Sequence, residues 1–345
     1  MKKIWILLIA TSILSSCNQK KADTPEKKQD KIPEYTALQT KSKTFFGELP
    51  AIAINEKNPV TKEKVALGKA LYFDTILSKN KTQSCNTCHN LDTYGVDNLP
   101  TSPGDGKGTL GTRNSPTTLN AALHIAQFWD GREPDVEAQA GGPVLNPIEM
   151  GMASKNEVEK RLSKDEKYKK MFAEAYPKDK NPITYDNMTK AIGAFERKLI
   201  IPSKFDDFIK GNSDALNKTE KEGLQLFFDK GCTTCHSGNA LGGNMFQKFG
   251  IFGNYWDLTK SKKVDGGKFE VTKNEADKYI FKAPSLRNIE KTYPYFHDGS
   301  VKDLKEAVKI MGKAQLNLDL TDEEAEKIVA FLNTLTGEVP AEYKL

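Results

Sequence analysis

The sequence predicts a mainly α-helical protein that contains two similar domains. Apolar residues recur at helical spacing behind residues that commonly cap helices, and runs that alternate apolar and polar residues are scarce. A chain of 345 residues usually exceeds what a single hydrophobic core supports. One short pattern also occurs twice along the chain, which favours two domains related by duplication.

The repeated pattern is G-x-x-L-[YF]-F-D, and each copy ends a short amphipathic segment. It reads GKALYFD at 68–74 and GLQLFFD at 223–229, and the same C-x-x-C-H motif follows both copies. Matching residues at equal offsets before the same motif indicate a repeated helical module. The connection from the glycine to the first cysteine is longer in the first copy, so we expect an inserted loop there.

Capping residues predict where the helices begin. Thr61 is a candidate N-cap in the first copy of the module, and Thr219 with Glu222 forms a candidate capping box in the second. Two further helices are expected in the first half of the chain, one capped by Ser154 and Glu157 and a long one from Thr184 to about Leu199. A third, capped by Ser300 and Asp303, should end near Met311 and Gly312. The last is capped by Thr321 and Glu324, and its apolar face consists of Ile328, Val329, Phe331, Leu332 and Leu335.

The first 16 residues resemble a signal for export. Lys2 and Lys3 precede an apolar stretch at 4–14 that is too short to span a bilayer as a stable helix. We therefore interpret residues 1–16 as a lipoprotein signal peptide. An ordinary signal peptide that happens to contain a cysteine is the alternative.

Cys17 is the expected site of lipid attachment. The sequence Leu-Ser-Ser-Cys at 14–17 resembles a bacterial lipobox, in which the cysteine becomes the lipidated first residue. Residues 17–43 are rich in Lys, Asp, Gln and Thr, so we expect a disordered tether there. One lipid and a tether predict a protein that is anchored to a membrane and does not span it. Asn18 after the cysteine, where Asp would be a retention signal, favours the outer membrane by resemblance to sorting rules.

The charge balance excludes one class of partner. The formal net charge is +5, and acidic and basic residues are interspersed along the chain. No basic stripe resembles a nucleic-acid footprint, so we expect no nucleic-acid partner. A modest surface patch for a protein partner is compatible with this charge.

Apart from Cys17, the cysteines form two C-x-x-C-H motifs. They read CNTCH at 85–89 and CTTCH at 232–236. This is the attachment motif of c-type haem, because two thiols bond to the vinyl groups of one porphyrin and the adjacent His ligates the iron. Zinc sites use shorter separations between pairs, a redox dithiol does not require the His, and a C-x-x-C disulfide would not explain two histidines. We therefore predict two covalently bound haem c groups, held by Cys85, Cys88 and His89 and by Cys232, Cys235 and His236.

Three segments resemble the bacterial dihaem cytochrome c peroxidases. They are RNSPTTLNAALHIAQFWDGREPDVEAQAGGPVLNPIEMGM at 113–152, FKAPSLRNIEKTYPYFHDGS at 281–300 and AVKIMG at 307–312. The resemblance extends over roughly residues 45–340.

The resemblance implies two domains with different roles. Residues 44–200, joined by 338–345, would form an N-terminal domain with a peroxidatic haem. Residues 201–337 would form a C-terminal electron-transfer haem domain.

Two residues would serve electron transfer if the resemblance holds. Met311 matches the distal ligand of the second haem iron, although a Met at a helix end is more often part of a core. Related enzymes that mature a tryptophylquinone cofactor carry Tyr there, so Met311 argues against oxidation of a protein or organic substrate. Trp129 matches the family tryptophan that lies between the haems and helps electrons pass.

Gln139 and Glu149 match the family's pair beside the peroxidatic iron. Cleavage of the O–O bond needs a proton moved from one peroxide oxygen to the other, and a carboxylate can act as that general acid and base. An amide beside it can orient peroxide or water. Without the resemblance, Glu149 would be taken for a solvated loop carboxylate.

The resemblance also implies a calcium site and a role for His297. Asn114 and the carbonyls of Thr292 and Pro294 match the family's inter-domain calcium ligands, and oxygen ligands suit this ion. His297 matches a family His near the second haem. His124 is interpreted as a structural histidine, with iron ligation as the less favoured alternative.

Asp105 marks a departure from the family pattern. Many members carry a labile distal His on the first haem in a loop reading T-S-x-G-H, and this chain has TSPGD at 101–105. We hypothesise that the first haem is open, or holds only water, when both haems are ferric. The alternative is a ligand from His124 or from the rearranged loop. The glycine-rich stretch GDGKGTLGT at 104–112 does not match a phosphate-binding P-loop and is interpreted as a mobile loop beside the first haem.

The sequence therefore predicts a lipid-anchored peroxidase in the periplasm that reduces hydrogen peroxide to water. Electrons would arrive singly from a small cytochrome c or cupredoxin in weak, transient encounters. A homodimer is compatible with the sequence. The alternative function is a dihaem c-type electron carrier without peroxidase activity.

Overall fold

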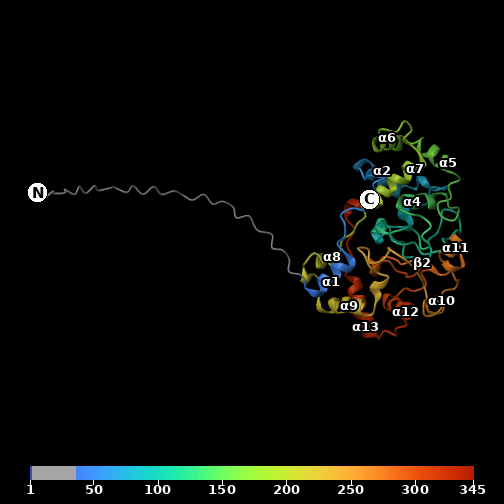
Figure 1. Cartoon of the computed structure of the whole chain (residues 1–345). Coiled ribbons are helices and arrows are strands. Elements are labelled where there is room, and N and C mark those ends of the chain that lie inside the picture. Colours follow the sequence, from blue (N-terminus) through green and yellow to red (C-terminus); the bar gives the residue numbers. More distant parts are fainter. Residues whose placement is uncertain (2–35) are drawn as a thin grey trace. The chain divides into compact units, whose positions relative to one another are not determined.

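The computed structural model describes Met1 and residues 36–345 of the chain. The predicted signal peptide, Cys17 and most of the predicted tether lie outside the described residues. The described residues 36–345 belong to one unit, in which helices predominate (Figure 1). The helices are α1 (Ala37–Phe46), α2 (Lys62–Phe73), α3 (Cys85–Cys88), α4 (Val136–Leu145), α5 (Lys155–Leu162), α6 (Glu166–Ala175), α7 (Tyr185–Glu196), α8 (Lys204–Ile209), α9 (Lys218–Asp229), α10 (Tyr255–Thr259), α11 (Phe269–Thr272), α12 (Leu304–Leu316) and α13 (Asp322–Asn333).

One two-stranded sheet accompanies these helices in the described part of the chain. Strand β1 (Phe246–Lys248) pairs antiparallel with β2 (Ile280–Lys282), and Gln247 lies opposite Phe281. The prediction of a mainly helical fold is confirmed.

The duplicated module forms the same helix pair twice. Helix α2 packs against α7, and α9 packs against α13. A Cβ on Gly68 would lie 1.9 Å from the carbonyl oxygen of Ala191, and a Cβ on Gly223 would lie 1.8 Å from that of Lys327. The glycine of the repeated pattern therefore lets two helix backbones cross in contact in each copy.

Two hydrophobic cores lie around these pairs. The first core is built from residues between Leu67 and Ile201 and is completed by Val339, with Tyr343 packed against it. The second core is built from Phe46, residues from Phe205 to Leu241 and residues from Leu320 to Leu335. Figure 1 shows α2 and α4–α7 grouped in one part of the unit, and α1, α8, α9, α12 and α13 grouped in the other.

The structure corrects the predicted tether at its end. Residues 37–43 belong to α1, whose N-cap Thr36 and Gln39 form a capping box. The ring of Phe46 lies 5.6 Å from that of Phe205 and 5.5 Å from that of Phe228. The apolar end of this short segment is buried in the second core, so residues 37–43 are ordered as a helix and pack with the C-terminal part of the chain.

The predicted helix starts are confirmed at Thr61, Ser154, Thr184 and Thr321. Two were wrong. Asn217 and Glu220 form the capping box of α9, two residues before the predicted pair. Asp303 alone caps α12, which continues to Leu316 past the predicted end.

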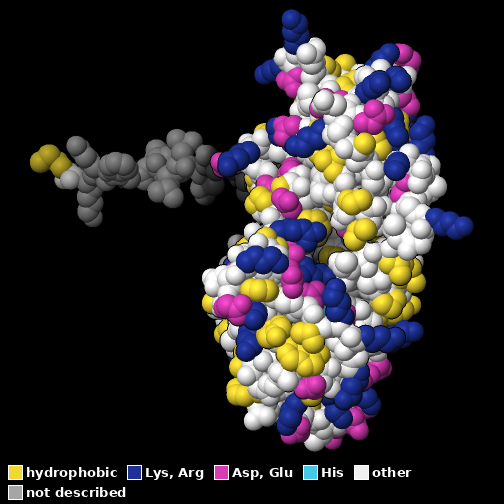
Figure 2. Space-filling view, turned by 90° about the vertical axis from the view of Figure 1, so that its right-hand side faces the viewer, with side chains coloured by type: hydrophobic (Ala, Val, Ile, Leu, Met, Phe, Trp, Pro, Cys, Tyr) yellow, Lys and Arg dark blue, Asp and Glu magenta, His cyan; other side chains and the backbone are white. Residues whose placement is uncertain are grey.

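The described surface is mixed in charge. Basic and acidic side chains are interspersed on the face drawn in Figure 2. In the part of the chain that the structure describes, no helix combines the length and apolar character that crossing a bilayer requires.

Candidate functional site

The first C-x-x-C-H motif forms a single helical turn at the edge of the first core. Ser84 and Thr87 form a capping box that starts α3, and His89 follows its last residue. The hydroxyl of Tyr72, from the repeated G-x-x-L-[YF]-F-D pattern, donates to the carbonyl oxygen of His89 at 2.6 Å. The equivalent aromatic residue in the second copy, Phe227, has its ring 6.4 Å from that of His236. In both copies, the repeated pattern thus supports the histidine of the motif that follows it.

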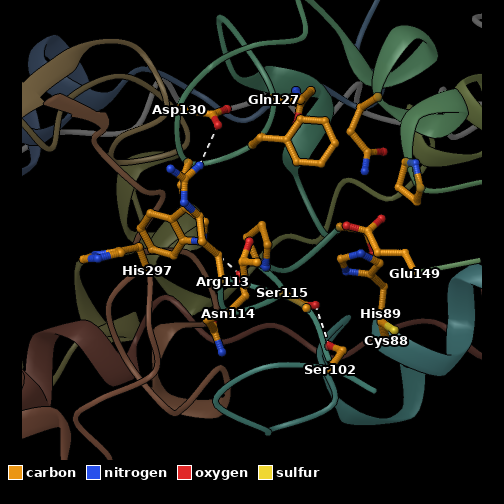
Figure 3. A pocket seen from close by; sticks show the side chains of 18 of the residues that line it. Cys88, His89, Ser102, Arg113, Asn114, Ser115, Gln127, Asp130, Glu149 and His297 are labelled. Carbon is orange, nitrogen blue, oxygen red and sulfur yellow. Dashed lines mark hydrogen bonds and ion pairs between the residues drawn. The ribbon is translucent and has the colours of Figure 1, made fainter. Parts of the chain in front are cut away.

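The first motif opens onto a cavity of about 750 Å³. His89 and Glu149 direct their side chains into it (Figure 3). The cavity is also lined by Cys85, Cys88, Ser102, Pro103, Arg113, Asn114, Trp129, Arg132, Gln139, Met150, Glu196, Asp265 and His297.

The second motif opens onto a cavity of about 230 Å³ with a more apolar lining. His236 is buried, and its Nδ1 lies 3.2 Å from the carbonyl oxygen of Leu241. Met311, on α12, lines the same cavity as His236. The imidazole of His236 and the thioether of Met311 therefore line one cavity.

The residues around both cavities fit a covalently attached haem. All four motif cysteines are free thiols, and each pair shares its cavity with the adjacent histidine. Burial raises the pKa of the Cys85 thiol to about 12, whereas a redox dithiol depends on a lowered pKa. The buried Nδ1 of His89 has no hydrogen-bond partner among the described residues. This donor set matches the two thiols and one imidazole that a c-type haem requires.

Trp129 lines both cavities, together with Asn114 and His297. Its indole N–H donates to the carbonyl oxygen of Asn114 at 2.9 Å, and the N–H of Asn114 donates to the carbonyl oxygen of His297 at 2.7 Å. The ring of His297 stacks on Phe281 with a centroid distance of 4.4 Å. Trp129, Asn114 and His297 therefore belong to the lining that the two cavities share.

Glu149 and Gln139 meet at the first cavity, although ten residues of sequence and the end of α4 separate them. Burial raises the pKa of Glu149, and the positive charge of Arg132 partly opposes this shift. The carboxyl group thus holds its proton to a higher pH than an exposed Glu would.

The residues of the predicted calcium site line the same cavity. Asn114, Thr292 and Pro294 all line the second cavity. The Asn114 side chain donates to the carbonyl oxygen of Leu99 at 2.9 Å. In the described part of the chain, no group of three or more His, Cys, Asp or Glu side chains could hold a metal ion, so any ion there would depend on amide and carbonyl oxygens.

Asp105 does not occupy the position expected of a distal ligand. Its carboxylate accepts hydrogen bonds from the N–H of Asn80 at 2.6 Å and from the hydroxyl of Thr82 at 2.6 Å. The side chain is 8% exposed and is absent from the lining of the first cavity. The loop around it is held by its own turn, in which the N–H of Gly104 donates to the carbonyl oxygen of Thr109 at 3.0 Å.

His124 also lies away from the first cavity. It lines the second cavity, so the alternative in which it ligates the first haem has no support in this arrangement. Its neighbour there is Lys282 on β2.

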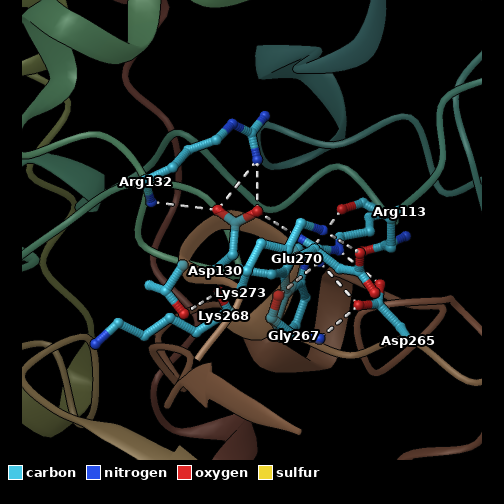
Figure 4. Close-up of polar contacts among 11 residues, drawn as sticks. Arg113, Asp130, Arg132, Asp265, Gly267, Lys268, Glu270 and Lys273 are labelled. Carbon is cyan, nitrogen blue, oxygen red and sulfur yellow. Dashed lines mark hydrogen bonds and ion pairs between the residues drawn. The ribbon is translucent and has the colours of Figure 1, made fainter. Parts of the chain in front are cut away.

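Sequence reasoning missed an ion-pair network beside the first cavity. Arg113 contacts Asp130 at 2.6 Å and makes a two-pronged contact with Asp265 at 2.7 and 2.8 Å (Figure 4). Burial raises the pKa of Asp265, but hydrogen bonding and charge from Arg113 outweigh it, so the net pKa is lowered. Arg132 also contacts Asp130 at 3.0 Å. The network connects Arg113 and Asp130, which lie on either side of Trp129 in the sequence, to Asp265 in the C-terminal half. No residue spacing in the sequence predicts such a contact.

The chain matches two protein-family models and is similar in sequence to known peroxidases. The family model described as "Di-haem cytochrome c peroxidase" matches residues 62–214, and the model described as "Cytochrome c" matches residues 220–336. The chain is 46% identical to the cytochrome c551 peroxidase of Nitrosomonas europaea over 298 residues, which is 86% of each chain. It is 44% identical to the cytochrome c551 peroxidase of Pseudomonas aeruginosa over 317 residues, which is 91% of each chain.

Among solved structures, one similar protein is described as a MauG-like protein associated with microbial copper homeostasis. The TM-score is 0.74 at 30% identity, and the match covers 84% of this chain and 94% of that one. Two cytochrome c-type domains, two C-x-x-C-H cavities and these relatives agree: the chain belongs to the di-haem cytochrome c peroxidase family.

Proposed function

We propose that this protein reduces hydrogen peroxide to two molecules of water, using two electrons and two protons. The electrons come one at a time from a small cytochrome c or cupredoxin. The observation that carries this proposal is the convergence of Glu149 and Gln139 on the cavity that His89 also lines. An electron carrier would have no use for a half-buried acid and amide at that place.

Glu149 moves the proton in the proposed reaction. Peroxide enters the first cavity, where the Gln139 amide orients it by hydrogen bonding. The Glu149 carboxylate accepts a proton from one peroxide oxygen and returns it to the other, which leaves as water. The raised pKa suits this exchange, because a group that gives and takes one proton works best when its pKa is near the working pH.

The chain holds its two redox centres apart and joins them through Trp129. When bound at His89, the first haem supplies the electrons that break the O–O bond. His236 and Met311 would hold the second haem, and a thioether ligand would favour a high potential. Trp129 contributes a side chain to both cavities, so it lies on the direct route between them.

Three finer features belong to the same proposal. Asn114, Thr292 and Pro294 provide oxygen ligands for a calcium ion where the two halves of the chain meet. Cys17 carries a lipid that anchors the protein to a membrane, the outer membrane being favoured, with the enzyme in the periplasm. The electron donor binds weakly, and a homodimer is compatible with the chain.

The variant Glu149→Gln tests the proposal. It keeps the size and polarity of the side chain and removes its ability to accept a proton. With the haem-loaded protein and a small-molecule reductant, we expect the rate of peroxide reduction to fall about 10²–10⁴-fold. The matched control is Glu56→Gln, which changes an exposed Glu that lines neither cavity.

Two results would overturn the proposal. Peroxide reduction by Glu149→Gln at the rate of the parent would remove Glu149 from the mechanism. A parent protein whose haems reduce and reoxidise with the donor, but which does not consume peroxide, would instead be an electron carrier.

A further inference from the structure

Lys282 is a buried cation that lacks a carboxylate partner. Among the described Lys and Arg residues, three are less than 9% exposed: Arg197, Lys282 and Arg287. Arg197 forms an ion pair with Glu137 at 2.6 Å, and Arg287 forms one with Asp206 at 2.8 Å. Lys282 forms no ion pair with any described residue, although it is only 7% exposed.

The hydrogen-bond partner of Lys282 is His124, which is itself basic. The Lys282 Nζ lies 3.2 Å from Nδ1 of His124. Burial, together with the neighbouring charge of Lys282, lowers the pKa of His124 well below its usual value, so the imidazole is neutral. With Nδ1 accepting from the ammonium group, the ring hydrogen of His124 is on Nε2.

Nε2 of His124 is buried and has no hydrogen-bond partner among the described residues. Both His124 and Lys282 line the second cavity. The imidazole is packed so tightly on Gly243 that a Cβ there would lie 2.2 Å from the ring carbon Cδ2. The Lys282 backbone is fixed as well, since its N–H donates to the carbonyl oxygen of Trp129 at 2.8 Å. Two buried donors, one of them charged, therefore line the same cavity.

This arrangement is costly unless an anion completes it. An unpaired buried charge or an unsatisfied buried donor destabilises a fold, and native proteins satisfy nearly all such groups. The group that fits this cavity is a c-type haem, whose ring is apolar and whose charged substituents are two propionate carboxylates. Those carboxylates are the chemical counterpart of the two buried donors.

We propose that Lys282 and His124 form the binding site for a propionate of the second haem. The ammonium group of Lys282 pairs with the carboxylate, and Nε2–H of His124 donates to it. The fixed positive charge beside the second haem favours its reduced form, which carries one positive charge fewer, and so raises its reduction potential. This inference rests on the haem assignment of the second motif and is independent of the peroxide chemistry.

The test compares Lys282→Met with Lys282→Arg in the haem-loaded protein. Potentiometric titration followed by absorbance reports the potential of each haem, and resonance Raman spectra report the bending modes of the propionates. We expect Lys282→Met to lower the potential of the second haem and to shift its propionate bands, with the first haem unchanged. Lys282→Arg should restore both towards the parent values.

Two further variants keep the result clear. Lys278→Met is the matched control. Lys278 lies four residues before Lys282, has an exposed side chain and pairs with Glu275, so its replacement should leave both readouts unchanged. His124→Gln tests the second donor if Lys282→Met fails to incorporate haem, and it should shift the propionate bands in the same direction. Unchanged potentials and Raman bands in a fully loaded Lys282→Met or His124→Gln protein would overturn the proposal, whatever its activity towards peroxide.

Discussion

The backbone N–H of Asp105 donates to the carbonyl oxygen of Glu149 at 2.6 Å. The carboxylate of the same Asp105 accepts from Asn80 and Thr82, which lie just before the first C-x-x-C-H motif. One residue thus joins the segment of the proposed acid and base to the segment that leads into the haem attachment site. Asp105, at the position where the resemblance led us to expect a labile histidine, connects two loops.

Asp105→Ala should destabilise the protein. It removes the acceptor for the hydrogen bonds from Asn80 and Thr82 at a residue that is only 8% exposed. We expect a loss of about 2–3 kcal/mol in the free energy of unfolding, measured by denaturant titration followed by circular dichroism. Lys107→Ala, on the exposed part of the same loop, is the control and should change little. Equal stability of the two variants would contradict the connecting role.

The direction of the Asp105 pKa gives this effect a pH dependence. Burial raises its pKa, but hydrogen bonds from Thr82 and Asn80 outweigh burial, so the pKa is lowered in the folded state. A lowered carboxyl pKa stabilises the fold above the unfolded pKa, and the stabilisation is lost as the pH falls through the folded value. The stability difference between the parent and Asp105→Ala should therefore shrink in acid.

The first haem should be free of a second histidine ligand when both haems are ferric. Asp105 points into the turn at 80–82, His124 lines the other cavity, and His297 is stacked on Phe281. Electron paramagnetic resonance of the fully oxidised, haem-loaded protein should show no bis-histidine low-spin signal from this haem. Activity should also appear without prior reduction. A bis-histidine signal would show that the loops rearrange.

Arg132→Gln should move the acid side of the pH profile. Glu149 must be deprotonated to accept a proton from peroxide, so activity falls as the pH drops below its pKa. Arg132 holds that pKa below the value burial alone would give. Loss of its charge should raise the pKa and shift the acid limb of kcat/KM to higher pH. Arg132→Lys keeps the charge and should shift it less, and an unmoved limb in Arg132→Gln would refute the coupling.

Gly68→Ala and Gly223→Ala should each destabilise the fold by about 1–3 kcal/mol or more. A Cβ at either position would overlap a carbonyl oxygen of the crossing helix, at 1.9 and 1.8 Å respectively. Gly142→Ala is the control, because its added Cβ would meet Phe128 at 3.6 Å, an ordinary contact inside a helix. The measurement is the unfolding midpoint of each variant. Equal unfolding midpoints for all three variants would show that close helix crossing does not explain why the glycine occurs in both copies of the pattern.

Much of the fold and of the haem sites could be predicted because the signals are local. A C-x-x-C-H motif places two thiols and an imidazole on one turn whatever surrounds it. The pattern that precedes each motif is recognisable because it occurs twice in the same chain. Caps at Thr61 and Thr321 were recognisable for the same reason. The start of α9 was misplaced because two neighbouring polar residues, Asn217 and Thr219, each precede a suitable Glu, and sequence does not choose between them.

The sequence by itself determined the helical class, the two attachment motifs and the family resemblance, because each depends on residues close together in the chain or on long matching segments. The tertiary structure decided where Asp105 points, that His124 belongs to the second cavity and that Arg113 pairs with Asp265. The contacts behind these findings join residues up to 158 positions apart in the sequence, as for His124 and Lys282. Such contacts depend on how the two halves fold onto each other, and a cation without its counter-charge becomes visible only when every neighbour is in place.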